Sequence, residues 1–468
     1  MTAPALAGHD LGLIGLGTMG ANFARNLAGR GARLVLHDTD AARADALATE
    51  LGGGARAAPT LAAAVAALPR PRALFLLVPA GAAVDATIDE IADLLEPGDA
   101  VIDGGNSFWR DTEARVARLA KRGIDFLGFG VSGGSEGART GPAIMAGGDA
   151  AAVARVAPLF RAVAARHGET PCFVDCGAGG AGHFVKMVHN GIEYAAMQVL
   201  AETYVLLRDQ LGMDANGLAT TLRGWRHGPA GSFLLDCALR ALAARDGDAP
   251  QLDSIADTAS QKGTGSWAAI AALELGVPAP SLAEAVFART LSALRTERLA
   301  ASARPPSLAT SAGPASLDAI HDALLGASIA IHAQGFALVA AAAQAQGWRC
   351  DLAAIAASWR AGCIIRSRLM EAIAAALVED RTPANLVRLP VFADALAAAE
   401  PGWRQVAAAA AARATPVPCL ASALAYLDGY RQSRSGAHLI AAQRDIFGNH
   451  GFQRLDRPGS FHAAWPPA

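Results

Sequence analysis

Cysteine, long hydrophobic runs and charge of one sign are all scarce in this chain of 468 residues. The six cysteines are too widely spread for a disulfide framework, and Cys172 and Cys176 have no matching second pair, which argues against a zinc site. Uninterrupted apolar stretches such as residues 335–343 stop well short of the about 18 residues that a spanning helix needs. The first residues lack a basic segment followed by a long apolar one, so we expect no secretory signal, a cytoplasmic location and reduced thiols.

The charges of the chain nearly cancel. Forty Lys and Arg residues stand against 42 Asp and Glu residues, which gives a formal net charge of −2. The chain therefore has no global field that would attract nucleic acid or an anionic membrane, and we expect neither as a partner. Any phosphate that it binds must be held by a local cluster of cations.

The hydrophobic pattern divides the chain into three parts. Up to about residue 178, short apolar runs alternate with helical stretches, as in the β-α-β units of a parallel sheet. The expected strands are residues 11–14, 34–36, 74–78, 100–102, 126–129 and 172–174. Over residues 179–441, Ala/Leu-rich segments with apolar spacings of three and four predict helices. The last part, residues 442–468, is rich in Gly, Pro and aromatic residues and is expected to form an irregular tail.

A glycine motif joins the first expected strand to the first expected helix. It reads Gly15-Leu16-Gly17-Thr18-Met19-Gly20. In a strand-turn-helix context this spacing is typical of α/β Rossmann-type domains, where glycines permit the tight turn, the close approach of a pyrophosphate and the close packing of helix on strand. Asp38 ends the second strand, where a carboxylate accepts hydrogen bonds from an adenosine ribose and repels a ribose phosphate. The motif therefore predicts NAD in preference to NADP, and a turn without ligand is the alternative.

A second group of polar residues falls on one face of an expected helix. At 100° per residue, Lys186, His189, Asn190 and Glu193 lie at about 0°, −60°, +40° and −20° around the helix axis. A lysine and a glutamate on such a face can serve as separate proton-transfer groups for a substrate that lies along the helix. The alternative is a solvated polar stripe with weak ion pairing.

Three glycine-rich turns are candidate ligand sites. Residues 103–107 (DGGNS) and 131–134 (VSGG) each follow an expected strand, where open α/β sheets bind ligands, although either segment is equally consistent with a simple turn. Residues 261–265 (QKGTG) lack the full order of a nucleoside triphosphate loop, so we do not expect that ligand. Lys262, with its neighbouring glycines, is suited to hold a phosphate.

Taken together, these residues resemble the 6-phosphogluconate dehydrogenase family over nearly the whole chain. Seven motifs match in order: IDGGNS at 102–107, VSGG at 131–134, GAGHFVKMVHNGIEY at 180–194, KGTG at 262–265, FAR at 287–289, RAGCIIR at 360–366 and QRDIFGNHGF at 443–452. The resemblance implies oxidative decarboxylation of 6-phosphogluconate to ribulose 5-phosphate, a step of the pentose phosphate pathway, without a metal. It also implies that Lys186 is the general base and that Glu193 protonates the enediol.

The resemblance further assigns binding residues and a partner. Substrate contacts would come from Asn106, Ser132, Gly133, Gly134, His189, Asn190 and Tyr194, with Lys262, Arg289, Arg444 and His450 near the phosphate. Arg444 and His450 would reach the site of a neighbouring subunit, because the tail of a homodimer threads through its partner in this family. Cofactor contacts would come from Gly15, Leu16, Gly17, Thr18, Met19, Gly20, Asp38, Thr39, Val78, Pro79, Ala80 and Asn106.

The chain departs from the family pattern at several positions. Where NADP-using members commonly carry Asn-Arg-Ser or Asn-Arg-Thr, this chain has Asp38-Thr39-Asp40, and many of them have alanine in place of Gly17. NAD is therefore the expected cofactor, and NADP is the alternative. Pro79 replaces a lysine, Ser135 a glutamate and Ser266 a lysine, which affects the expected cofactor affinity and substrate preference. A β-hydroxyacid dehydrogenase for another substrate and a catalytically silent NAD-binding regulator are the alternative functions.

Overall fold

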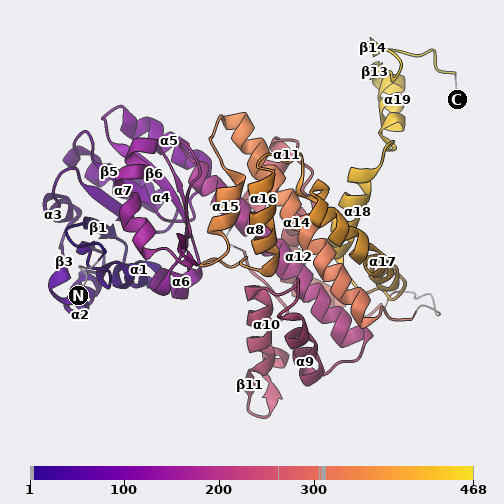
Figure 1. The fold of residues 1–468 in the computed structure, drawn as a ribbon, viewed down its shortest axis with the longest axis horizontal. Helices are drawn as coiled ribbons and strands as arrows, with labels where there is room; N and C mark the ends of the chain where they lie inside the picture. The colour runs from indigo at the N-terminus through magenta and orange to yellow at the C-terminus, as the bar shows by residue number, and fades with distance from the viewer. Residues whose placement is uncertain (1–4, 262, 305, 307–312, 467–468) are drawn as a thin grey trace.

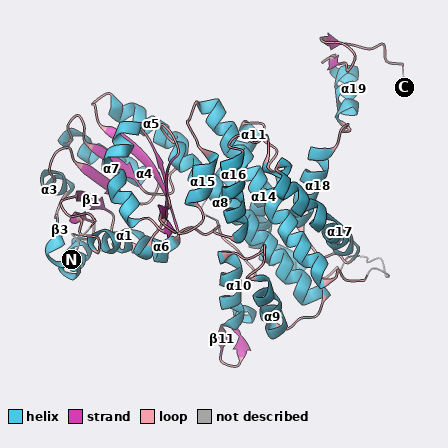
Figure 2. Cartoon of the chain, viewed as in Figure 1, coloured by secondary structure: helices cyan, strands magenta, loops and turns pink. Residues whose placement is uncertain are grey.

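The computed structural model describes residues 5–261, 263–304, 306 and 313–466. An α/β domain and a helical domain lie side by side along the long axis, and the C-terminal tail projects from the helical domain (Figure 1). Figure 2 shows the main sheet inside the first domain and helices making up most of the rest. The predicted fold class is confirmed.

The α/β domain is built on one eight-stranded sheet. Its spatial order is β10-β7-β6-β5-β4-β1-β2-β3. The strands are β1 (Asp10–Ile14), β2 (Arg33–His37), β3 (Ala55–Ala57), β4 (Ala73–Leu76), β5 (Ala100–Asp103), β6 (Asp125–Ser132), β7 (Ala143–Gly147) and β10 (Phe173–Asp175). Neighbouring strands are parallel except β6 and β7, which are antiparallel.

Two strands of this sheet were missed by the sequence analysis, and one pair, β6 and β7, departs from the parallel pattern that it predicted. β3 consists of Ala-Arg-Ala, which lacks the β-branched and aromatic residues that mark a strand. β7 (AIMAG) is short and follows β6 after the short helix α6 (Gly134–Thr140), which leaves too little chain for a parallel crossover. β7 therefore returns beside β6 in the opposite direction.

Helices cover both faces of the sheet. They are α1 (Thr18–Ala28), α2 (Ala41–Leu51), α3 (Leu61–Ala66), α4 (Ala82–Ile91), α5 (Trp109–Ala120), α6 and α7 (Ala150–Val163). Side chains of β4 alternate between two cores: Leu74 and Leu76 pack on one face, and Phe75 packs on the other. Because the central strands are buried on both faces, ligands are restricted to the edge where the strands end.

The helical domain is organised around α8 (Ala181–Val205). The other helices of this part are α9 (Ala215–Trp225), α10 (Phe233–Ala243), α11 (Thr264–Glu274), α12 (Pro280–Ala293), α13 (Arg295–Ala301), α14 (Leu317–Gln346), α15 (Leu352–Ser358), α16 (Arg368–Glu379), α17 (Pro390–Ala412) and α18 (Pro418–Arg431). α8 packs against α11, α12 and α14, and also against β6 and β7 of the first domain. One helix therefore connects the helical core to the sheet.

Short hairpins interrupt the helices at three places. The pairs are β8 (Arg166–His167) with β9 (Thr170–Pro171), β11 (Arg245–Asp246) with β12 (Ala249–Pro250), and β13 (Phe452–Gln453) with β14 (Ser460–Phe461). The pair β11–β12 lies in the part predicted to be all helical. Each of its strands has only two residues, which is too short to give a strand pattern in the sequence.

α14 is long and apolar enough to cross a membrane by length and composition. Its most apolar window has a mean hydropathy of 1.7, and 78% of that window is buried inside the protein. Such burial is typical of the core helix of a soluble protein, since α14 packs against α8, α17 and α18.

The tail is more regular than the sequence predicted. α19 (Ala437–Gly448) leads into the β13–β14 hairpin. The Asp445 carboxylate accepts hydrogen bonds from the amides of Gly451 and Ala463 and from the indole of Trp465, and it pairs with His462. The expected irregular tail therefore contains the end of α19 and a short hairpin, and one buried carboxylate holds these to the loops between and after them.

Candidate active site

The backbone of α8 lies unusually close to β6 at the position of Lys186. A Cβ atom at Gly130 of β6 would lie 2.3 Å from the Cβ of Lys186, and one at Gly182 would lie 2.2 Å from the carbonyl oxygen of Gly128. Only glycine fits at these contacts. The lysine stem is therefore pressed against the strand, and its amine lies near the carboxyl edge of the sheet.

Lys186 is at the centre of a polar cluster. Its Nζ donates a hydrogen bond of 2.7 Å to Oδ1 of Asn190 and lies 3.4 Å from Nδ1 of His189. That same imidazole nitrogen lies 3.9 Å from a carboxylate oxygen of Glu193. The four residues that share one face in the helix projection are thus brought together, with His189 between the amine and the carboxyl group.

The two proposed proton-transfer groups have pKa values shifted in opposite directions. Burial lowers the pKa of Lys186 from its usual value, although the nearby Glu193 and Cys363 oppose the shift. Burial raises the pKa of Glu193, although the charges of Lys186 and Arg289 oppose that shift. Burial and the charge of Lys186 lower the pKa of His189 well below its usual value, so this imidazole is neutral. Such opposing shifts make a lysine a better base and a glutamate a better acid near neutral pH.

The loop after β6 closes one side of this cluster. Ser132 Oγ lies 3.3 Å from Nε2 of His189. Gly133 has a φ of 114°, and a Cβ there would lie 2.6 Å from the carbonyl oxygen of Gly362. The predicted VSGG and RAGCIIR motifs are therefore neighbours in space, and Gly134 begins α6 beside them.

Tyr194 and Arg289 lie at the other end of the cluster. The guanidinium of Arg289, on α12, stacks 3.5 Å from the ring centroid of Tyr194. A Cβ at Gly265 in the first turn of α11 would lie 2.5 Å from the same ring. The KGTG motif therefore reaches the site through α11, while Lys262 itself lies outside the described residues.

Buried side chains to which the sequence analysis gave no individual role hold the loop after β5. The Asp103 carboxylate accepts hydrogen bonds from the amide of Gly105 (2.9 Å) and the hydroxyl of Ser107 (2.6 Å). His183 of α8 contacts the carbonyl oxygen of Asp103 through Nε2 (3.1 Å) and the hydroxyl of Thr112 through Nδ1 (2.7 Å).

Because a carbonyl oxygen only accepts, Nε2 of His183 carries the proton and Nδ1 accepts from Thr112. This network presents the exposed Asn106 between Gly105 and Ser107. An aspartate inside an apolar strand and a histidine one turn before Lys186 are the signals that would have identified Asp103 and His183.

The glycine motif forms an anion-binding turn at the end of β1. Gly15 has a φ of 90°, and a Cβ at Gly20 would lie 1.9 Å from the carbonyl oxygen of Gly15, so a larger residue at position 20 would force the turn apart. Gly17 is the N-cap of α1 and makes no side-chain capping bond, which leaves the first amides of the helix for a ligand. Thr18 and Met19 lie in that first turn, and the turn therefore fits a pyrophosphate. A Cβ at Gly17 would meet nothing within 4 Å, so alanine would also fit there.

Asp38 closes the adenosine end of this turn. Its carboxylate accepts hydrogen bonds from the backbone amides of Leu16 (2.6 Å) and Asp40 (2.9 Å). Arg43 of α2 lies 3.4 Å from Asp38 and 3.4 Å from Asp40. Although burial raises the pKa of Asp38, these hydrogen bonds and the Arg43 charge hold it below its usual value, so the group is a carboxylate.

The remaining expected cofactor residues follow the ends of strands at the same edge of the sheet. Thr39 is exposed after β2, and Val78, Pro79 and Ala80 form the turn between β4 and α4, where Pro79 and Ala80 are exposed. The donors and the carboxylate at this edge are the groups that a dinucleotide requires. Within the described residues, no group of three or more His, Cys, Asp or Glu side chains is arranged to hold a metal ion.

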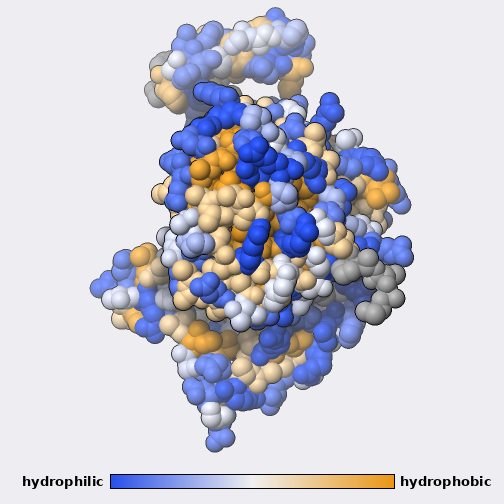
Figure 3. Space-filling model, turned by 90° about the vertical axis from the view of Figure 1, so that its left-hand side faces the viewer, coloured by the Kyte–Doolittle hydropathy of each residue, from blue (hydrophilic) through white to orange (hydrophobic). Residues whose placement is uncertain are grey.

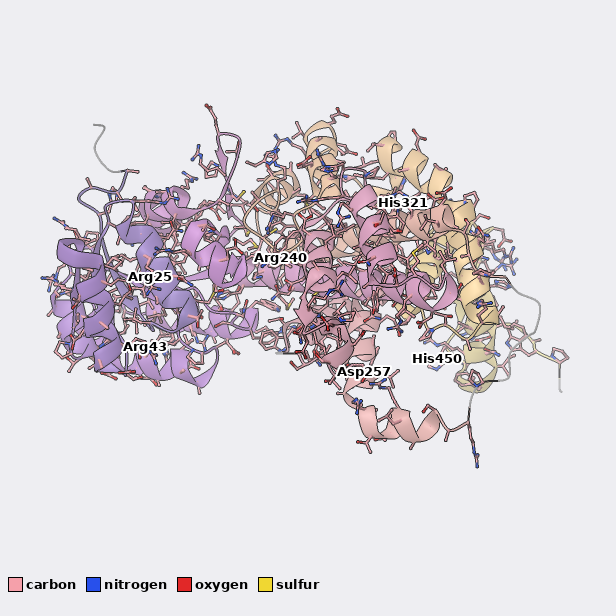
Figure 4. The ribbon with its side chains drawn as sticks, turned by 90° about the horizontal axis from the view of Figure 1, so that it is seen from below. Arg25, Arg43, Arg240, Asp257, His321 and His450 are labelled. Atoms are coloured by element: carbon pink, nitrogen blue, oxygen red, sulfur yellow. The ribbon has the colours of Figure 1, made fainter. Side chains whose placement is uncertain are left out.

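Arg444 and His450 are not brought to this cluster within one chain. Both are exposed, on and just after α19. The tail stands off from the body (Figures 1 and 3), and Figure 4 places His450 at the end of the long axis opposite Arg43 of the α/β domain. The phosphate cluster expected from the sequence is therefore incomplete in the single chain.

Known proteins match this chain over nearly its full length. Residues 10–177 match the sequence model of the NAD binding domain of 6-phosphogluconate dehydrogenase, and residues 182–465 match that of its C-terminal domain. A Treponema pallidum protein named 6-phosphogluconate dehydrogenase, decarboxylating, is 42% identical over 98% of this chain and 97% of its own length. A Bacillus subtilis protein named as the NAD(+)-dependent, decarboxylating enzyme is 40% identical over 98% of this chain and 99% of its own.

A solved structure agrees with this assignment. The Plasmodium falciparum 6-phosphogluconate dehydrogenase, described in its apo form and in complex with NADP+ and with 6-phosphogluconate, matches with a TM-score of 0.94. It is 32% identical, and the match covers 97% of this chain and all of that one. The sequence models, the full-length relatives and the fold agree, and the chain belongs to the 6-phosphogluconate dehydrogenase family.

Proposed function

We propose that this chain catalyses the oxidative decarboxylation of 6-phosphogluconate to ribulose 5-phosphate and CO2, with NAD as the preferred electron acceptor. One observation carries the proposal: a buried lysine with a lowered pKa and a glutamate with a raised pKa lie on one face of α8. A scaffold protein has no need for such a pair. The family relatives named above carry the same activity in their names.

Lys186 would begin the reaction as a general base. Its neutral amine takes the proton from the hydroxyl group on the third carbon of the substrate, and that carbon becomes a carbonyl. Bound NAD supplies the electrophilic nicotinamide that accepts the hydride from the same carbon. Asn190 accepts a hydrogen bond from Lys186 Nζ and so fixes the direction of the amine.

Glu193 would complete the reaction as a general acid. The new carbonyl lies β to the carboxylate, so the carbon-carbon bond breaks with loss of CO2, and its electron pair passes towards the carbonyl oxygen. Protonated Lys186 stabilises the negative charge on that oxygen. Glu193 then gives its proton to the carbon that lost CO2, which yields ribulose 5-phosphate. Lys186 gains one proton and Glu193 loses one, and His189 lies between them.

We propose that the phosphate group is held across a homodimer. Arg289 and Lys262 would come from the chain that carries Lys186, and Arg444 and His450 from the tail of its partner. Two features of α19 support an interface. It projects from the body of its own chain, and it exposes apolar side chains, including Leu439 (59% exposed) and Phe447 (73% exposed). Arginine and lysine together suit a dianionic phosphate.

The preference for NAD rests on the carboxylate of Asp38. At the end of β2, its carboxylate oxygens would accept hydrogen bonds from the ribose hydroxyls of NAD. Its negative charge would repel the additional phosphate of NADP. Arg43 neutralises part of this charge from α2, but it is shared between Asp38 and Asp40. NADP should therefore be used with lower efficiency.

The test is NADH and NADPH formation by purified protein with 6-phosphogluconate, measured by absorbance with each cofactor separately. Turnover with a higher kcat/KM for NAD supports both parts of the proposal. Turnover with a higher kcat/KM for NADP contradicts the preference alone. If neither cofactor is reduced, the catalytic proposal fails and the silent regulator remains.

A further inference from the structure

Three arginines on and just after α5 form a row of ion pairs with three aspartates on and just after α4. The pairs are Arg115–Asp85, Arg118–Asp89 and Arg122–Asp93. The two helices lie side by side on the α/β domain (Figure 1). Exposed pairs of this kind contribute little to stability, because water screens them and long side chains lose freedom. The row of ion pairs alone therefore explains only the packing of the two helices.

The Arg115 pair differs from the other two. The Arg115 side chain is 3% exposed, whereas those of Arg118 and Arg122 are 45% and 44% exposed. Its Nε and Nη2 donate to the two oxygens of Asp85 at 2.8 and 2.9 Å. Nη2 also donates to the carbonyl oxygen of Gly81 at 3.2 Å. A guanidinium this deeply buried needs several partners, and it takes one from the backbone of a loop.

The remaining nitrogen of Arg115 faces a second loop. Nη1 lies 3.7 Å from Oδ2 of Asp103 and has no hydrogen-bond partner, although it is buried. Asp103 is fully buried and holds the loop that presents Asn106 through the amide of Gly105 and the hydroxyl of Ser107. A small approach of the two groups would turn this contact into a charge-assisted hydrogen bond.

The two loops that Arg115 contacts are expected to serve the two ligands differently: the first is assigned to the cofactor alone, and the second carries Asn106, which is assigned to both cofactor and substrate. Gly81 directly follows the turn of residues 78–80 between β4 and α4, which lies on the cofactor side. Asp103 ends β5 and directly precedes the loop to α5, in which Asn106 is exposed. A single guanidinium therefore contacts both loops. Because Nη1 of Arg115 is buried without a hydrogen-bond partner, an arrangement in which it donates to Asp103 is favoured.

We propose that Arg115 is a positioning residue that couples the binding of the dinucleotide to the binding of the sugar acid. The proposal rests on the proposed function, because it takes the two ligands from it. Binding of either ligand orders its own loop and brings Nη1 of Arg115 and Asp103 into hydrogen-bond distance. The other loop is then held in its binding position, so the second ligand binds more tightly.

The test measures this coupling without catalysis. NADH and 6-phosphogluconate form a complex that cannot react, because reduced cofactor accepts no hydride. NADH affinity is measured by its fluorescence, with and without saturating 6-phosphogluconate, and the ratio of the two dissociation constants is the coupling factor. Arg115→Lys keeps the charge but has one nitrogen, which cannot serve both loops. Arg118→Lys makes the same change in the neighbouring, exposed ion pair with Asp89 and is the matched control.

We expect the substrate to tighten NADH binding by roughly tenfold in the unmodified protein and in Arg118→Lys. In Arg115→Lys the coupling factor should fall close to one. A purely structural role would lower thermal stability and leave this ratio unchanged, because both constants are measured on the same variant. An unchanged ratio in Arg115→Lys, or no coupling in the unmodified protein, overturns the proposal.

A second variant protects the test if Arg115→Lys does not fold. Asp103→Asn keeps an oxygen for the amide of Gly105 but removes the charge that faces Arg115, and it should also abolish the coupling. If it retains full coupling, the Arg115–Asp103 contact is not the link. The outcome is separate from that of the proposed function: reduction of NAD by the unmodified protein with 6-phosphogluconate supports that function whatever the coupling factor.

Discussion

At the scale of single residues, the chemistry depends on the environment of Lys186. Replacing this lysine with alanine removes the base and leaves the glycine turn and Asp38 intact, because neither contacts Lys186. We expect Lys186→Ala to lower kcat by about 10²- to 10⁴-fold. NADH binding, measured by fluorescence titration, should change little.

The chain offers a matched control for this substitution. Lys121 is an exposed lysine at the end of α5, and Lys121→Ala should leave kcat unchanged. Near-normal turnover by Lys186→Ala would remove the lysine from the mechanism. A loss of NADH binding equal to the loss of kcat would instead indicate a structural defect.

The charge of Glu193 gives a second prediction at this scale. The base must be neutral, so hydride transfer accelerates as the pH rises through the pKa of Lys186. Burial lowers that pKa, and the charge of Glu193 raises it in the molecules in which this carboxyl group is ionised. Glu193→Gln removes the opposing charge, so the pKa of Lys186 should fall further. The acidic limb of the profile for the first NADH-forming turnover should therefore move to lower pH.

Rapid mixing of enzyme, NAD and 6-phosphogluconate over a pH series measures this limb apart from the later protonation step. Glu90→Gln, an exposed change on α4, is the control and should not move it. A shift of the limb to higher pH in Glu193→Gln would contradict the electrostatic argument.

At the scale of elements, α8 and the glycine turn are largely predictable and the sheet is less so. The spacing of Lys186 and Glu193 places them on one helical face in the sequence and in the structure. Likewise, the strand-turn-helix pattern identifies the Gly15 turn. β3 and β7 were missed because their identity comes from pairing with β2 and β6, which a local pattern does not contain. Arg115 has the same limitation, since its loop partners are distant in sequence.

α8 also carries a buried carboxylate that fixes another helix. The side chain of Glu202 accepts hydrogen bonds from the backbone amides of Cys419 and Leu420 in the first turn of α18. Burial raises its pKa from 4.5 to about 7, although these hydrogen bonds oppose the shift. The carboxylate replaces a local cap, because the N-cap of α18 makes no side-chain hydrogen bond.

This shift predicts a pH-dependent stability. The folded protein holds the Glu202 proton more tightly than the unfolded chain, so the contribution is fully present below about pH 4.5 and is lost as the pH rises through about 7. The loss should amount to about 3 kcal/mol of the free energy of unfolding. Urea unfolding over this pH range should show it in the unmodified protein, and Glu202→Gln should flatten that part of the curve. Parallel curves for the two proteins would exclude Glu202 as the source.

At the scale of the whole molecule, the single chain separates residues that the proposed reaction needs together. Lys186 lies beside the α/β domain, whereas Arg444 is exposed on the projecting tail. The resemblance to the family implies that both act at one site and that Arg444 reaches it from a neighbouring subunit. A tail that docks on a second copy resolves the separation, because a two-fold dimer then completes two sites by exchange.

Mixing two variants with different defects distinguishes exchange from a site within one chain. Arg444→Ala should raise the KM for 6-phosphogluconate, and Lys186→Ala should abolish turnover. If tails exchange, a mixed dimer has one site with both defects and one site with neither, since the intact lysine meets the intact arginine of the other chain. Unfolding and refolding the two variants together at equal amounts should then restore roughly a quarter of the intact sites. Each variant refolded alone is the control. Recovery no greater than the average of these controls at low 6-phosphogluconate would show that Arg444 does not act on a partner's site.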